Sequence, residues 1–105
     1  MDVKIYSNQD VLEIIAAVPE GHYHTRFILK LKDQIIVLQE ATVAGLLRAF
    51  ALTALHPTRK GIILKNKLVK QEKKHGFAKY QLIEIPDSEE EAVRRVSMIL
   101  NMNKH

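Results

Sequence analysis

Lysine and arginine, the residues that bind phosphate groups most readily, are concentrated in one part of this sequence. The 105 residues include 16 Lys or Arg and 12 Asp or Glu, which gives a formal net charge of +4. Residues 58–83 carry +7, because they hold eight basic residues against Glu72 alone, whereas residues 1–57 carry −1 and residues 84–105 carry −2. The eight are Arg59, Lys60, Lys65, Lys67, Lys70, Lys73, Lys74 and Lys79. This asymmetry predicts a polyanionic partner.

The basic segment has the pattern of a β-hairpin. Residues 61–69 and 77–85 are rich in β-branched and aliphatic residues, and residues 70–76 between them are polar. A two-stranded ribbon fits a nucleic-acid groove, and each Lys near a phosphate releases counterions when it binds. We therefore expect DNA or RNA to be bound through phosphate contacts with little sequence preference. The alternative is that these lysines protect an exposed edge strand and keep the protein soluble.

A second candidate is the pair of histidines in Gly21-His22-Tyr23-His24. In extended backbone, His22 and His24 would point to one face, where two imidazoles can share a metal ion. The sequence has no H-E-x-x-H motif and no cysteine to supply further ligands. Solvent-exposed histidines beside a turn are the alternative, and the sequence predicts no cofactor.

Catalytic chemistry has little support in the sequence. The absence of cysteine excludes a thiolate nucleophile and a disulfide framework, and there is neither a G-x-S-x-G motif nor a glycine-rich phosphate loop. Glu40, His24 and His56 could perform acid–base chemistry only if they met in a cleft. The sequence therefore favours a non-enzymatic protein, with a small enzyme or ligand-binding domain that uses a His- and Glu-lined cleft as an alternative.

A strip of small or apolar residues suggests a contact between copies of the chain. Gly45, Ala49 and Leu52 are spaced so that they share one face of a helix predicted over residues 42–56. This helix is apolar on nearly every side, so it needs more than one covering surface. The strip predicts either a homodimer interface or packing within the chain, against its own sheet or another of its helices. A homo-oligomeric structural or regulatory protein without nucleic-acid binding is therefore a further alternative.

The elements that would position these residues follow from periodicity and capping. Ser7 and Asp10 have capping-box spacing before an apolar run, and Pro19-Glu20-Gly21 reads as a turn. The expected elements are a strand at Val3 to Tyr6, a helix at Gln9 to Val18, two strands within Thr25 to Glu40 with a break at Lys32-Asp33-Gln34, the helix ending at His56-Pro57, the hairpin at 61–69 and 77–85, and a helix capped by Asp87 or Ser88.

This order, β-α-β-β-α-β-β-α, predicts a single α+β domain over residues 1–105. We expect a mostly antiparallel sheet with the helices packed mainly on one face. The hydrophobic fraction of 47% and charged fraction of 27% are those of a globular domain. No run of 18 apolar residues and no signal-peptide pattern occurs. The expectation is a cytoplasmic protein that does not enter membranes.

The element order and the basic hairpin resemble the Alba-like family of small basic nucleic-acid-binding proteins. The resemblance covers the strand at 3–6, the helix at 9–18, the strand at 35–39, the helix at 43–55 and the hairpin. It implies a dimer whose body sits on a duplex while the hairpin arms follow a groove. The family's basic pair after the first strand falls here on Ser7-Asn8-Gln9, which is uncharged, and the strand at 25–32 and the last helix are additional. Only the hairpin lysines are therefore carried over as binding residues.

Overall fold

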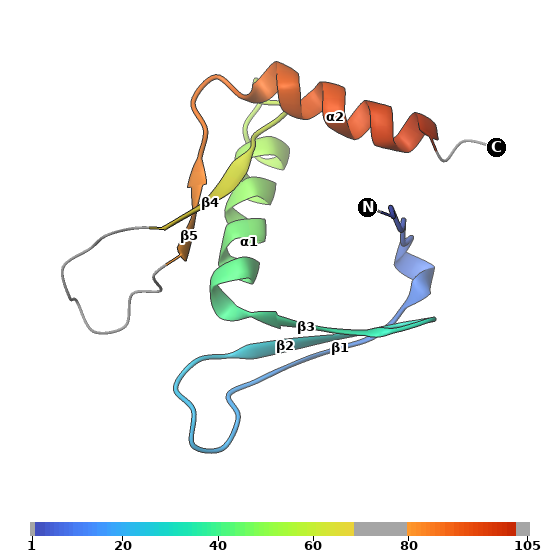
Figure 1. Ribbon diagram of the computed structural model, residues 1–105, viewed down its shortest axis with the longest axis vertical. Helices are drawn as coiled ribbons and strands as arrows, with labels where there is room; N and C mark the ends of the chain where they lie inside the picture. The colour runs from blue at the N-terminus through green and yellow to red at the C-terminus, as the bar shows by residue number, and fades with distance from the viewer. Residues whose placement is uncertain (1, 69–79, 103–105) are drawn as a thin grey trace. The chain divides into compact units, whose positions relative to one another are not determined.

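A computed structural model describes residues 2–68 and 80–102 (Figure 1). Over these residues the fold is α+β, with two α-helices and five strands in two antiparallel sheets, which confirms the predicted class. The chain divides into two compact units, residues 1–43 and residues 44–105. The first contains a three-stranded sheet, and the second contains the basic hairpin.

The first unit is built on strands β1 (Val11–Ala17), β2 (Arg26–Leu31) and β3 (Ile35–Gln39), in that spatial order. The two predicted strands β2 and β3 are confirmed, and the amide of Leu31 donates to the carbonyl of Gln34 at 2.8 Å to close the turn between them. The register aligns Ile14, Leu29 and Ile36 in one row across the sheet. The adjacent row on the other face is also apolar, so β-branched side chains occupy both faces.

The predicted N-terminal strand and helix are wrong. Residues 2–7 form no regular element, and residues 11–17, expected within the helix Gln9 to Val18, form strand β1. The Ser7 to Asp10 spacing does begin a turn, but only the single 3₁₀ turn η1 (Asn8–Asp10). An apolar run with several β-branched residues fits a buried helix and a strand equally well. Pairing with β2 decides the outcome, and this tertiary contact is invisible to local periodicity.

The turn predicted at Pro19-Glu20-Gly21 is present. The amide of His22 donates to the carbonyl of Pro19 at 3.0 Å, and Gly21 has a φ of 76°. Only glycine adopts this left-handed conformation without a steric penalty. The turn reverses the chain between β1 and β2.

Helix α1 (Glu40–Ala54) begins directly after β3 and ends before Pro57 as expected, and the second unit is built around its residues from Ala44 onward. Strands β4 (Leu64–Leu68) and β5 (Tyr80–Glu84) pair antiparallel and confirm the predicted hairpin, and Figure 1 shows this β4–β5 ribbon beside α1. Gly45 is buried where α1 meets the ribbon, because a β-carbon built there would lie 2.8 Å from Leu82 Cδ1. The guanidinium of Arg48 donates to the carbonyl of Leu82.

Helix α2 (Glu89–Met102) confirms the last predicted helix, and its first turn is fixed to the segment before β4. The buried hydroxyl of Ser88 accepts from the amide of Ile63 at 3.0 Å, and Glu89 Oε1 accepts from the amide of Lys60 at 2.7 Å. Gly61 lies so close to the helix that a β-carbon would be 2.7 Å from the carbonyl oxygen of Glu89 and 2.9 Å from Ala92 Cβ. This contact has no room for any side chain.

We predict that Gly61→Ala destabilises the protein by about 1–3 kcal/mol, because the new methyl group would collide with helix backbone that cannot move without shifting α2. The midpoint of thermal unfolding should fall by about 4–8 °C for each kcal/mol lost. Circular dichroism during heating measures this change. Lys60→Ala is the matched control, since its side chain is exposed and its backbone donor to Glu89 remains. An unchanged midpoint in Gly61→Ala would contradict the close approach.

Candidate functional site

The β4–β5 ribbon brings Lys65 and Lys67 onto one face. In the ribbon register, Lys65 lies opposite Ile83 and Lys67 lies opposite Gln81, so these four residues share a face. The other face carries Leu64 and Leu82, which contact α1 at Gly45. Both lysines are exposed, and neither forms an ion pair with another described residue. The face away from α1 is therefore positively charged.

Arg59 and Lys60, the other described members of the basic set, have different surroundings. Arg59 is partly buried, and its guanidinium pairs with Glu84 at 3.4 Å, which fastens the segment before β4 to β5. Lys60 borders a groove between α1 and α2, and its backbone amide is bound by Glu89. Neither residue shares the face of Lys65 and Lys67. The sequence grouped Arg59 and Lys60 with the ribbon lysines because they are close along the chain, but the fold places them elsewhere.

The remaining members of the predicted basic set lie outside the described residues. These are Lys70, Lys73, Lys74 and Lys79. Their contribution is known from the sequence, where they supply four of the eight positive charges in residues 58–83. Their assignment as binding residues stays a prediction.

The strip of Gly45, Ala49 and Leu52 lies on the inner side of α1. Gly45 is buried against the chain's own ribbon, while Ala49 and Leu52 are half-buried. Ala49 lines the groove of about 410 Å³ that also borders α2. At Gly45 the strip is therefore covered by the chain's own ribbon. Packing within the chain was one of the two outcomes expected from the sequence.

The opposite side of α1 exposes large apolar side chains that are not part of this strip. Leu46, Leu47 and Phe50 are each more than half exposed. Their signal in the sequence was the apolar character of the helix on every side, which indicated a second cover without naming its residues.

The two candidate metal-binding histidines are exposed, and no group of three or more potential His, Asp or Glu ligands occurs in the part of the chain that the structure describes. Instead His24 Nδ1 lies 3.4 Å from Glu40 Oε1, and Glu40 Oε2 accepts from the amide of Thr25 at 2.9 Å. The Thr25 amide, with help from His24, holds the pKa of Glu40 below its ordinary value. This pair connects the start of β2 to the start of α1 on an exposed surface. His56 forms a local hydrogen bond with Thr58 at 3.2 Å.

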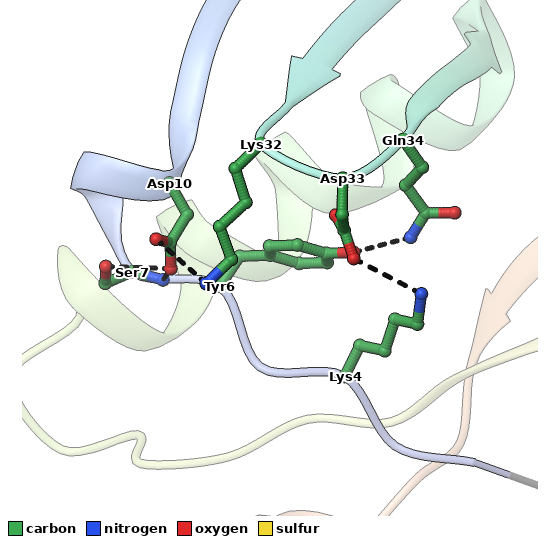
Figure 2. A network of polar contacts seen from close by, with 7 residues as sticks. All are labelled: Lys4, Tyr6, Ser7, Asp10, Lys32, Asp33 and Gln34. Carbon is green, nitrogen blue, oxygen red and sulfur yellow. Dashed lines mark hydrogen bonds and ion pairs between the residues drawn. The ribbon is translucent and has the colours of Figure 1, made fainter.

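A network of polar contacts at the N-terminus joins residues that the sequence had not grouped (Figure 2). The hydroxyl of Tyr6 donates to Asp33 Oδ1 at 2.9 Å and accepts from Gln34 Nε2, and Lys4 pairs with Asp33 at 3.3 Å. Chiefly the Tyr6 hydroxyl, and also Lys4, hold the pKa of Asp33 below its ordinary value of 3.8. The network fixes the irregular N-terminal segment to the β2–β3 turn.

The second carboxylate in Figure 2 completes this attachment. Asp10 accepts from the amide of Ser7 at 2.8 Å and from its hydroxyl at 3.0 Å, and it pairs with Lys32 at 3.4 Å. These contacts, chiefly those from Ser7, lower the pKa of Asp10. Because the carboxylates are already bound by donors of the same chain, the arrangement is structural.

Comparison with protein-family models, with curated proteins and with solved structures finds no match to this chain. The resemblance to the Alba-like family therefore stays a prediction. Of the described helices, neither has the length and apolar character needed to cross a membrane.

We predict that Tyr6→Phe raises the pKa of Asp33 toward 3.8, because the variant removes the strongest donor to the carboxylate. A group with a depressed folded pKa stabilises the protein above its unfolded pKa, and this stabilisation disappears as the pH falls through the folded pKa. The variant should therefore be less stable than the native protein above about pH 4, with the difference vanishing in stronger acid.

A carbon-detected NMR titration of the Asp33 carboxyl and thermal unfolding at several pH values measure both effects. Tyr23→Phe is the control, since Tyr23 is 93% exposed. An Asp33 pKa that is the same in Tyr6→Phe and in the native protein would contradict the network.

Proposed function

We propose that this chain is a non-enzymatic nucleic-acid-binding protein that contacts phosphates through the β4–β5 ribbon. The observation that carries the proposal is the placement of Lys65 and Lys67 on the ribbon face opposite the one that α1 covers. That face is open to solvent at both lysines. A long nucleic acid can approach it without displacing any described part of this unit.

The lysine spacing suits a row of phosphates. Residues two apart in a strand are separated by about 6.6 Å, and phosphates along one strand of a duplex recur about every 3.4 Å of axis. Two flexible side chains at this distance reach separate phosphates. Lysine acts as a point charge without the fixed donor fork of arginine, so it favours phosphates over particular bases. The ribbon therefore fits binding with little sequence preference to DNA or RNA.

The surroundings of other cations support this choice of surface. Lys4 pairs with Asp33, Lys32 pairs with Asp10, and Arg59 pairs with Glu84. These contacts neutralise positive charge locally. Lys65 and Lys67 have no acidic residue directly opposite them in the ribbon register, since their partners are Ile83 and Gln81. Their charge is therefore available to an external anion.

The test is a salt titration of binding with Lys65→Ala/Lys67→Ala. Each phosphate contact contributes about 0.9 to the slope of log affinity against log salt for duplex DNA. Losing two contacts should make the slope shallower by about 1.8, so that the native protein loses roughly tenfold more affinity than the variant between 50 and 200 mM salt. Fluorescence anisotropy with duplex DNA, single-stranded DNA and RNA of unrelated sequences measures these slopes.

Lys30→Ala, set beside Lys65→Ala and Lys67→Ala as single variants, is the matched control, because Lys30 is also exposed and has no ion pair among the described residues. Its salt slope should stay close to that of the native protein. Equal slopes for the ribbon variant and the native protein would overturn the assignment to Lys65 and Lys67. Binding that does not respond to salt, or no binding to any of the three nucleic acids, would overturn the proposed function itself.

A further inference from the structure

The two helices of the second unit expose more apolar surface than a helix pair needs for its own packing. On α1, Leu46, Leu47 and Phe50 lie opposite the side that meets the ribbon, and Phe50 is 61% exposed. On α2, Val93, Val96 and Leu100 form a stripe in which Val96 is 58% exposed. These six side chains are named below as the helical apolar surface.

Helix α2 is fastened at its start. Ser88, Glu89, Ala92 and Val93 contact the segment that contains Gly61, and every residue from Val93 to Met102 is exposed to solvent. The helix has 14 residues and is about 21 Å long. Isolated helices of this length are marginal in water, and an amphipathic helix gains most of its stability when its apolar face is packed. We therefore expect α2 to be more stable when another surface covers its exposed apolar stripe.

A groove between α1 and α2 could receive side chains of such a partner. The groove has a volume of about 410 Å³. Phe50 and Ala49 border it from α1, and Val93 and Val96 border it from α2. It therefore brings Phe50 of α1 together with Val93 and Val96 of α2.

The charge of this surface argues against an anionic membrane or a nucleic acid as its occupant. Glu91 binds both Arg95, at 2.8 Å, and Arg94, at 2.9 Å, so the arginines of α2 are already paired. Helix α2 carries −1 overall, from three glutamates and two arginines. Helices that lie on anionic lipid are instead rich in basic residues. An apolar protein surface is the matching partner.

The spacing of the stripe points to a second copy of the same helix. Val93, Val96 and Leu100 are separated by three and then four residues, which is the spacing of a coiled-coil seam. When two such helices run antiparallel, Val93 of one copy meets Leu100 of the other and the two Val96 residues lie near the centre. This arrangement is self-complementary, as a twofold dimer requires.

The size of the surface is sufficient for a specific dimer. Six large side chains that are each about half exposed present roughly 600 Å² together. Two copies would therefore bury roughly 1,200 Å², which is the lower end of the range for specific protein–protein interfaces. The largest apolar patch on a typical monomer is about 300–600 Å², so these six side chains in one continuous surface would be at the upper limit for a protein that stays alone.

We propose that the helical apolar surface is a homodimer interface in which α2 packs antiparallel against α2 of a second copy, flanked by the exposed side of α1. This goes beyond the nucleic-acid function, because the interface and the ribbon lysines are different residues. Either proposal can fail while the other holds.

Sedimentation equilibrium of Val96→Glu tests the interface. The native protein should have twice the monomer mass at about 100 μM, a concentration above the μM-to-pM range of Kd that specific interfaces span. Val96→Glu should raise the dimer Kd by about 100-fold or more, because it places two unpaired carboxylates, one from each copy, at the centre of the seam. Met98→Glu is the matched control, since it makes the same kind of change about 160° around the helix from Val96 and should leave the dimer intact. Far-UV circular dichroism checks that each variant is folded.

Cysteine cross-linking tests the interface without a disruptive charge. The chain contains no cysteine, so a single introduced thiol can pair only with a second copy. Oxidised Val96→Cys should give a covalent dimer in high yield, and Met98→Cys should not. A monomeric native protein, a dimer that tolerates Val96→Glu, or equal cross-linking of the two cysteine variants would overturn the proposal. Nucleic-acid binding measured on the same samples reports separately on the ribbon.

Discussion

Close packing against two glycines is the constraint on which the second unit depends. At Gly45 the side chain of Leu82 comes within van der Waals distance of the α1 backbone, and at Gly61 the first turn of α2 lies against the extended chain. Dispersion attraction falls off steeply with distance, so these close contacts stabilise the unit. A larger residue at either position would push the two elements apart and weaken the contacts. The two contacts hold the ribbon and α2 on the rest of their unit.

The glycine contacts also determine which surfaces remain open. Because α1 occupies the ribbon face that carries Leu82, the alternation of the strands turns Lys65 and Lys67 to the other face. Because α2 is fixed through residues up to Val93, the stripe continues past this attachment at Val96 and Leu100. One unit thus presents a charged face and an apolar face. These two surfaces suit different partners, since a polyanion gains nothing from the apolar stripe and an apolar partner would have to desolvate the lysines.

Sequence patterns predicted the elements whose signals are local. The polar break at Lys32-Asp33-Gln34 separated β2 from β3, the apolar composition before Pro57 indicated α1, and Asp87 or Ser88 marked the start of α2. The segment Val11–Ala17 was misassigned because its apolar run fits either period, and only pairing with β2 makes it a strand. The pairing of Arg59 with Glu84 and the contact of Gly61 with α2 join residues about 25 to 30 positions apart. No local pattern contains such information, so the separation of Arg59 and Lys60 from the ribbon lysines was not foreseeable.

The proposed dimer interface would increase the nucleic-acid affinity of the proposed ribbon surface, because a dimer carries two ribbons. A ribbon with few lysines makes few phosphate contacts, and each contact is weakened by salt. A twofold dimer carries two ribbons, so once one is bound the other meets the same nucleic acid at a high effective concentration, provided that the geometry lets both reach it. Avidity of this kind multiplies affinity without adding base contacts and therefore preserves the lack of sequence preference. It also makes binding depend on protein concentration through the dimer equilibrium, so an apolar seam made of residues such as Val96 would govern an electrostatic function that it never touches.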